Sequence, residues 1–144
     1  MSTLRVACVI PTYNGCQDLA RLLDSLEIQS APFDTLIVDS SSSDGTYELA
    51  LARCANVLRI DSRDFNHGGT RQLMVERYAD YDLYVFMTQD AYLEDAEGLA
   101  RIVAPFADPQ VGAVCGRQLP HLDASPLANH CLLYTSDAAD EEDS

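Results

Sequence analysis

The sequence predicts an α/β domain with a mostly parallel central sheet flanked by helices. Four short apolar runs predict strands over residues 6–10, 36–38, 57–60 and 83–87. The run over 6–10 is continuous, as in a strand covered on both faces, and the run over 83–87 is also expected to be buried. Segments with helical spacing of apolar residues separate these runs. Strands that alternate with helices are joined by crossover connections, so neighbouring strands run parallel.

The helices follow from apolar residues placed three or four positions apart. The clearest helix is expected over residues 17–29, with leucines at 19, 22, 23 and 26. Ser43 or Asp44 can cap a helix over residues 46–54. Further elements are expected in chain order: a helix from 66–69 to about 79, a helix around 99–106, and a fifth strand over 111–115.

Composition excludes several classes of protein. The formal net charge of -14 argues against binding nucleic acid or an anionic membrane by bulk electrostatics. The five cysteines are odd in number and form no C-x-x-C pair, so we interpret them as buried hydrophobic residues in a reducing compartment. The first residues contain no apolar signal-peptide core, and no apolar run reaches membrane-spanning length. We therefore expect a cytoplasmic protein.

The last residues depart from the alternating pattern. We expect one domain over residues 1–130, incomplete on its C-terminal side, and an acidic segment over residues 131–144. This segment is either a disordered acidic tail or sequence foreign to the native protein. We favour the second interpretation, because residues 131–141 resemble translated adapter sequence. The chain would then be the front part of a longer protein.

Polar residues follow each of the four apolar runs. They include Thr12-Tyr13-Asn14, Asp39-Ser40, Asp61 and Thr88-Gln89-Asp90. In an open α/β sheet, ligands bind outside the carboxyl ends of the strands, which predicts a site for a polar ligand. The common phosphate-binding loop, the G-x-G-x-x-G fingerprint and the G-x-S-x-G elbow are all absent from the sequence.

The most specific chemical hypotheses concern two aspartates. Asp90 can hold Mg²⁺ or Mn²⁺ together with phosphate oxygens, or it can cap the helix that follows. Asp39 can accept hydrogen bonds from a ribose hydroxyl or a pyrimidine N–H. Alternatively, it is a turn aspartate bonded to Ser41 or Ser42.

Three further residues allow both a functional and a structural interpretation. Tyr13 can stack on a base, or it can simply pack beside the turn. Arg71 can bind an anion together with the N–H groups of Gly68-Gly69, or it can be a surface arginine after a loop. His67 is either a catalytic group or a cap or turn residue.

Several segments together resemble the family 2 glycosyltransferases, especially their bacterial rhamnosyltransferase-like members. The matching segments are Val9-Ile10-Pro11-Thr12-Tyr13-Asn14, Ile37-Val38-Asp39-Ser40-Ser41-Ser42-Ser43-Asp44-Gly45-Thr46, Phe65-Asn66-His67-Gly68-Gly69-Thr70-Arg71, Thr88-Gln89-Asp90-Ala91 and Gly116-Arg117-Gln118-Leu119-Pro120. The resemblance implies a GT-A nucleotide-sugar-binding fold and a metal-dependent, inverting sugar transfer.

The resemblance also implies roles for individual residues. The nucleotide-binding residues would be Thr12, Tyr13, Asp39 and Arg71, with Asp90 on Mg²⁺ or Mn²⁺, and Gln89, Arg117 and Gln118 near the donor sugar or the acceptor. The family often has a D-x-D triplet where this chain has Thr88-Gln89-Asp90, so only the last carboxylate of that triplet is present. The Thr-Gln-Asp-Ala form itself is similar to rhamnosyltransferase-type members.

The resemblance implies two partners, a nucleoside-diphosphate sugar as donor and a saccharide or lipid-linked saccharide as acceptor. The donor it favours is dTDP-rhamnose, and a UDP-sugar is the alternative. An inverting transfer needs a general base, which in this family comes from a later segment, so we expect these 144 residues alone to be inactive. Membrane association, peripheral at the inner face, would come only through the missing part. The alternatives are a non-catalytic nucleotide-sugar binding module and a nucleotidylyltransferase. The latter usually has a Gly-rich basic loop after its first strand.

Overall fold

The computed structural model describes residues 4–114. The chain divides into two compact units, residues 1–97 and residues 98–144. The first unit contains, in chain order, β1 (Val6–Thr12), α1 (Cys16–Glu27), β2 (Asp34–Asp39), α2 (Thr46–Arg53), β3 (Asn56–Arg59), the 3-10 turn η1 (Ser62–Asp64), α3 (His67–Arg77) and β4 (Leu83–Phe86). These elements match the predicted order of strands and helices, and their ends differ from the prediction by a few residues.

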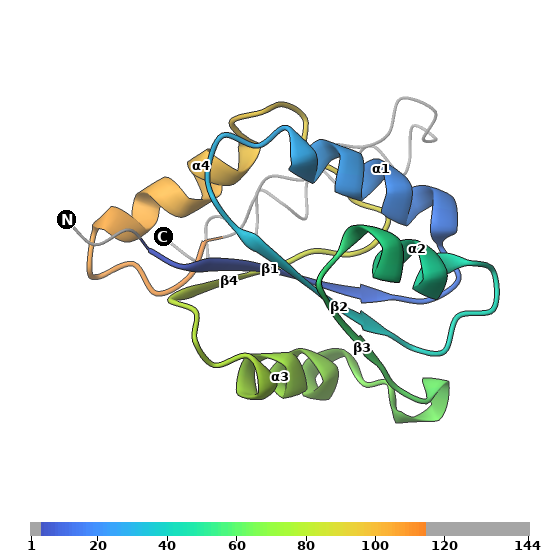
Figure 1. The fold of residues 1–144 in the computed structure, drawn as a ribbon. Coiled ribbons are helices and arrows are strands. Elements are labelled where there is room, and N and C mark those ends of the chain that lie inside the picture. Colours follow the sequence, from blue (N-terminus) through green and yellow to red (C-terminus); the bar gives the residue numbers. More distant parts are fainter. Residues whose placement is uncertain (1–3, 115–144) are drawn as a thin grey trace, which may run out of the picture. The chain divides into compact units, whose positions relative to one another are not determined.

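The four strands form one parallel sheet in the order β3-β2-β1-β4 (Figure 1). The expected parallel α/β architecture is therefore confirmed. β1 lies in the interior of the sheet, and the chain moves outward from it in opposite directions toward β2 and toward β4. Such a reversal of strand order opens a crevice at the carboxyl ends of the strands. Thr12 and Asp39 are paired in register at that end of β1 and β2.

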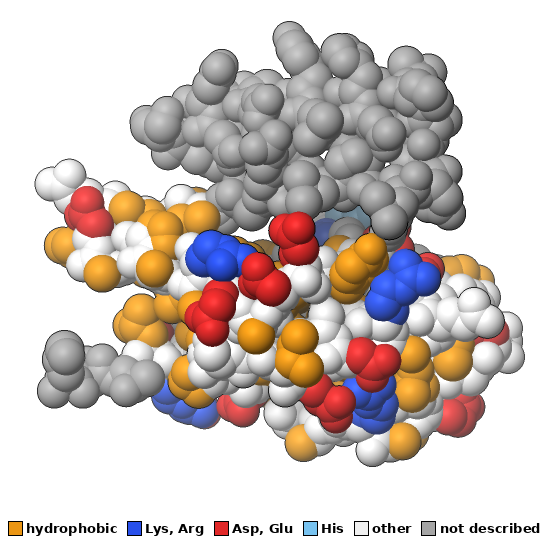
Figure 2. Space-filling view, turned by 90° about the horizontal axis from the view of Figure 1, so that it is seen from above, with side chains coloured by type: hydrophobic (Ala, Val, Ile, Leu, Met, Phe, Trp, Pro, Cys, Tyr) orange, Lys and Arg blue, Asp and Glu red, His pale blue; other side chains and the backbone are white. Residues whose placement is uncertain are grey.

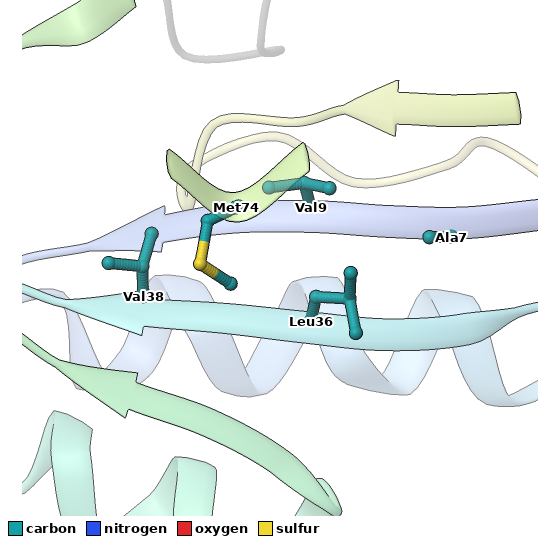
Figure 3. Close-up of a cluster of buried hydrophobic side chains, with 5 residues drawn as sticks. All are labelled: Ala7, Val9, Leu36, Val38 and Met74. Atoms are coloured by element: carbon teal, nitrogen blue, oxygen red, sulfur yellow. The ribbon is translucent and has the colours of Figure 1, made fainter. Parts of the chain in front are cut away.

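Helices cover both faces of the sheet, with α1 and α2 on one face and α3 on the other (Figure 1). The predicted leucine stripe of α1 is buried, because all four of its leucines are at most 5% exposed. On the opposite face, Met74 of α3 packs over Ala7, Val9, Leu36 and Val38 of β1 and β2 (Figure 3). Alternate residues of each strand serve the two faces, as the two-residue period of a strand requires.

The second unit differs from the prediction in two ways. The helix expected around residues 99–106 is a short α4 (Gly98–Val103) followed by the 3-10 helix η2 (Ala104–Ala107). Pro105 explains the change, because it has no N–H to continue the α-helical hydrogen bonds. The predicted fifth strand is wrong for residues 111–114, which form no strand and pair with none of the described strands. Cys115, the last residue of that prediction, lies outside the described residues.

Two observations concern the surface of residues 4–114. None of the helices in this part of the chain has the length and apolar character needed to cross a bilayer. On the face seen in Figure 2, acidic and basic side chains are interspersed, and the basic ones form no extended area.

Candidate nucleotide-sugar site

A pocket of about 320 Å³ opens at the carboxyl ends of the strands in the first unit. Its lining comes from the end of β1 and the chain up to the first turn of α1, from the segments that follow β2 and β4, and from residues at the start of α3. The lining residues are Pro11, Thr12, Tyr13, Asp18, Ser40, Phe65, His67, Arg71, Thr88, Gln89 and Asp90. The structure thus brings together five of the predicted site residues: Thr12, Tyr13, Arg71, Gln89 and Asp90.

Asp39 lies beneath this pocket and is not among its lining residues. The side chain is fully buried and accepts three hydrogen bonds. Two come from the hydroxyls of Thr12 (2.7 Å) and Ser42 (2.6 Å), and one comes from the main-chain N–H of Ser42 (2.9 Å). The turn interpretation of Asp39, with Ser42 as partner, therefore describes its observed contacts. Its contact with a nucleoside stays a prediction.

The loop after β1 is held by side chains from other loops. Its four successive N–H groups each donate to one of them: Tyr13 to Gln89 Oε1 (2.9 Å), Asn14 to Ser42 Oγ (2.9 Å), Gly15 to Thr46 Oγ1 (3.0 Å) and Cys16 to Asp44 Oδ2 (3.3 Å). Asn14 adopts a left-handed conformation with φ 44° in this loop. Because side chains already occupy the N–H groups at the start of α1, a ligand anion would have to displace them to bind there.

Asp44 links the starts of α1 and α2. It accepts hydrogen bonds from the side chain and the main-chain N–H of Thr46, besides the one from Cys16. These donors, the Thr46 hydroxyl above all, lower the pKa of the Asp44 carboxyl below its usual range. Gly45, between the two residues, has φ +98°, a conformation that favours glycine. Of the two predicted caps, Asp44 is the one that binds the start of α2.

Asp90 occupies a turn directly after β4. Its side chain is exposed at the pocket, and among residues 4–114 it has no hydrogen-bond or ion-pair partner. The next helix, α4, begins only at Gly98, so Asp90 does not cap it. An exposed carboxylate with free oxygen lone pairs fits a hard divalent cation that also binds phosphate oxygens. No group of three or more potential ligands from His, Cys, Asp and Glu occurs in the described part of the chain.

The start of α3 also contributes to the lining. Asn66 caps this helix by accepting a hydrogen bond from the N–H of Gly69 (2.9 Å), so that N–H is not free for a ligand. Arg71 donates to the carbonyl oxygen of His67 (2.8 Å) and has no acidic partner among the described residues. The rings of Phe65 and His67 meet edge to face, with centroids 5.0 Å apart. Arg71 therefore keeps most of its guanidinium donors available to an anion in the pocket.

Three lining residues, Asp18, Ser40 and Phe65, had no site role in the sequence analysis, and Ser40 was expected to serve the turn alone. Asp18 belongs to the first turn of α1, and Phe65 precedes α3, so neither directly follows a strand. The sequence signal that could have found them is that each lies within one helical turn of a predicted strand end or helix start. Arg117 and Gln118 lie outside the described residues, as does the predicted domain boundary at residue 130.

Comparisons with known proteins place this site in a family. The profile of the family described as "Glycosyl transferase family 2" matches residues 7–138. The O-antigen chain rhamnosyltransferase RfbN of Salmonella typhimurium is 46% identical over 129 residues, and WbaN of Salmonella anatum, with the same description, is 42% identical over 124 residues. These alignments cover 88% and 85% of this chain but only 41% and 39% of the relatives. The chain thus spans about two fifths of their length.

A solved structure shares the fold. The mannosyltransferase PcManGT from Pyrobaculum calidifontis, in complex with GDP-Man and Mn²⁺, superimposes with a TM-score of 0.68 and 26% identity. The match covers 77% of this chain and 34% of the other. The expected GT-A fold is confirmed by this likeness and by the parallel sheet. On its sequence and its fold, the chain belongs to glycosyl transferase family 2.

Proposed function

We propose that this chain is the donor-binding part of a rhamnosyltransferase. The parent enzyme would transfer rhamnose from dTDP-rhamnose to a saccharide or lipid-linked saccharide acceptor, with inversion at the sugar carbon. The observation that carries the proposal is the lining of the pocket, which includes an exposed tyrosine, a guanidinium and a carboxylate. Among the described residues, the guanidinium has no acidic partner and the carboxylate has no hydrogen-bond or ion-pair partner. The names of the two Salmonella relatives support rhamnose as the sugar.

The three groups suit three parts of a nucleoside-diphosphate sugar. Tyr13 is 53% exposed, so its ring is available to stack on the base. Arg71 offers several N–H donors and a fixed positive charge to the diphosphate. Asp90 would hold Mg²⁺ or Mn²⁺ against the diphosphate oxygens. When bound, the metal supplies positive charge that stabilises the leaving group.

The proposal separates binding from transfer. The acceptor hydroxyl needs a general base, and we assign that base to a part of the parent enzyme beyond these residues. The 144-residue chain should therefore bind the donor without transferring its sugar. Incubation with dTDP-rhamnose and candidate saccharide acceptors should release no dTDP above the buffer control. Repeated acceptor-dependent turnover would contradict this part of the proposal.

Asp90→Asn tests the metal assignment. Calorimetry would measure dTDP binding to the wild type and to the variant, each with and without Mn²⁺. We expect Mn²⁺ to raise the affinity of the wild type by about tenfold or more, or about 1.4 kcal/mol, and to leave the variant nearly unchanged. Asp64→Asn is the matched control, because Asp64 is exposed and does not line the pocket. An equal Mn²⁺ enhancement in wild type and Asp90→Asn would refute the assignment.

A further inference from the structure

We infer that Gln89 is a positioning residue that fixes the main chain of Tyr13 to the turn that carries Asp90. The contact thereby holds Tyr13, on the nucleoside side of the pocket, at a fixed distance from Asp90, on the metal side. The roles of Tyr13 and Asp90 in this inference rest on the proposed function. The link between Gln89 and Tyr13 rests on the structure alone.

The first observation is a two-point hydrogen bond. The N–H of Tyr13 donates to Gln89 Oε1 (2.9 Å), and Gln89 Nε2 donates to the carbonyl oxygen of Tyr13 (2.8 Å). A primary amide provides both an acceptor and a donor in one plane, which a carboxylate cannot do. The paired register of β1 and β4 ends at Val9 and Phe86, followed by one bond from Met87 N to Val9 O. The Gln89 amide thus joins the two chain segments beyond the end of their ladder.

The second observation is the space that Gly15 leaves for this amide. A Cβ atom on Gly15 would lie 2.5 Å from Cδ, 2.6 Å from Nε2 and 2.8 Å from Oε1 of Gln89. Gly15 has φ -137°, which any residue can adopt. The close approach of the Gln89 amide, at the end of a flexible side chain, is therefore one reason for glycine at this position.

The third observation is how the loop is anchored. The N–H groups of Asn14 and Cys16 donate to side chains of the segment between β2 and α2, and that of Gly15 donates to the first residue of α2. Among the described residues, only the Gln89 side chain makes hydrogen bonds between residues 13–16 and residues 88–90. Loss of that amide should leave Tyr13 attached to the β2 side of the pocket and let the Asp90 turn move independently.

A double-mutant cycle tests the contact itself. Gly15→Ala should lower the melting temperature of the 144-residue chain, because the new methyl group collides with Gln89. In the Gln89→Ala background the same substitution should lower the melting temperature only slightly, since the colliding atoms are gone. Gly112→Ala is the control, because a Cβ there meets nothing within 4 Å. If Gly15→Ala lowered the melting temperature equally in both backgrounds, the contact between Gly15 and Gln89 would be refuted.

Hydrogen exchange at the Tyr13 amide gives a second readout that needs no nucleotide. Gln89→Ala and Gln89→Glu should both speed exchange there, because neither side chain restores the two-point bond. Gln72→Ala, which alters an exposed glutamine on α3, should leave the Tyr13 rate unchanged. An unchanged rate in both Gln89 variants would overturn the inference.

Binding measurements separate positioning from direct contact. If Gln89 acts by positioning, Gln89→Ala should reduce the Mn²⁺-dependent gain in dTDP affinity by about tenfold, although Tyr13 and Asp90 are still present. A direct sugar contact predicts normal dTDP binding and a loss confined to dTDP-rhamnose, and that result would overturn the inference. If the wild type binds no dTDP, the proposed function fails, while the cycle and the exchange rate still decide whether Gln89 holds Tyr13.

Discussion

Substitution of Asp39 tests the buried hydrogen-bond network beneath the pocket. In Asp39→Ala, two hydroxyls and the Ser42 N–H lose their acceptor in a fully buried place. A buried donor left without a partner costs about 1–3 kcal/mol, and each hydrogen bond to a charged group contributes about 1.5–3 kcal/mol. The hydroxyls can rotate toward other acceptors, so we expect a total loss of about 3–5 kcal/mol.

Asp39→Asn should reduce the free energy of unfolding by less than Asp39→Ala does. The asparagine oxygen can keep the Ser42 N–H, while its NH₂ group donates to the Thr12 and Ser42 hydroxyls after these rotate. The variant then loses mainly the charge assistance of its hydrogen bonds, about 1–2 kcal/mol. Urea unfolding followed by far-UV circular dichroism measures both losses. Asp64→Asn, an exposed control, should remain within about 0.5 kcal/mol of the wild type.

Two results would refute this reasoning. An Asp39→Ala variant as stable as the wild type would mean that the network contributes nothing to the fold. An asparagine variant less stable than the alanine variant would mean that the hydroxyls cannot rearrange. The folded asparagine variant also tests the predicted nucleoside contact, because a large loss of dTDP affinity with little loss of stability would support that contact.

Two further predictions concern titratable groups. A hydrogen bond of 2.7 Å from the Tyr81 hydroxyl to the Asp34 carboxylate raises the pKa of Tyr81 to about 12, so this contribution to stability is complete below pH 10 and is lost as the pH rises toward 12. Absorbance at alkaline pH should show one late-titrating tyrosine that Tyr81→Phe removes, and titration of all tyrosines near pH 10 would contradict this. Burial raises the pKa of the Cys8 thiol to about 12, so iodoacetamide should label Cys8 only after unfolding. Equal labelling of native and urea-unfolded chain at Cys8, measured by peptide mass spectrometry, would contradict the predicted protection.

Much of the fold could be predicted because burial leaves a direct pattern in the sequence. The apolar runs of β1 and β2 are buried as such runs require, and α1 has the leucine stripe that its buried face requires. The expectation of a buried strand is wrong for β4, because Phe86 is 45% exposed. The prediction of a fifth strand was wrong for residues 111–114, because an apolar run forms a strand only when a neighbouring strand pairs with it, and none of the described strands pairs with these residues. Local patterns carry no information about that neighbour.

The site was predictable only in part, for a related reason. Residues that directly follow strands, such as Tyr13 and Asp90, could be placed in one crevice from the topology alone. Asp39 was expected after the strand but is the last residue of β2, and its carboxylate is buried in hydrogen bonds with Thr12 and Ser42. The bond from Gln89 to Tyr13 spans 76 positions in the sequence and depends on main-chain atoms, so no pattern of residue types reveals it.

The most direct test of the account is where a nucleotide and its metal bind. A crystal of the 144-residue chain grown with dTDP and Mn²⁺ would locate the metal by its anomalous scattering. We predict one Mn²⁺ peak in contact with the Asp90 carboxylate, with the diphosphate toward Arg71 and the base on Tyr13. Nucleotide bound outside this pocket, or Mn²⁺ held away from Asp90, would contradict it.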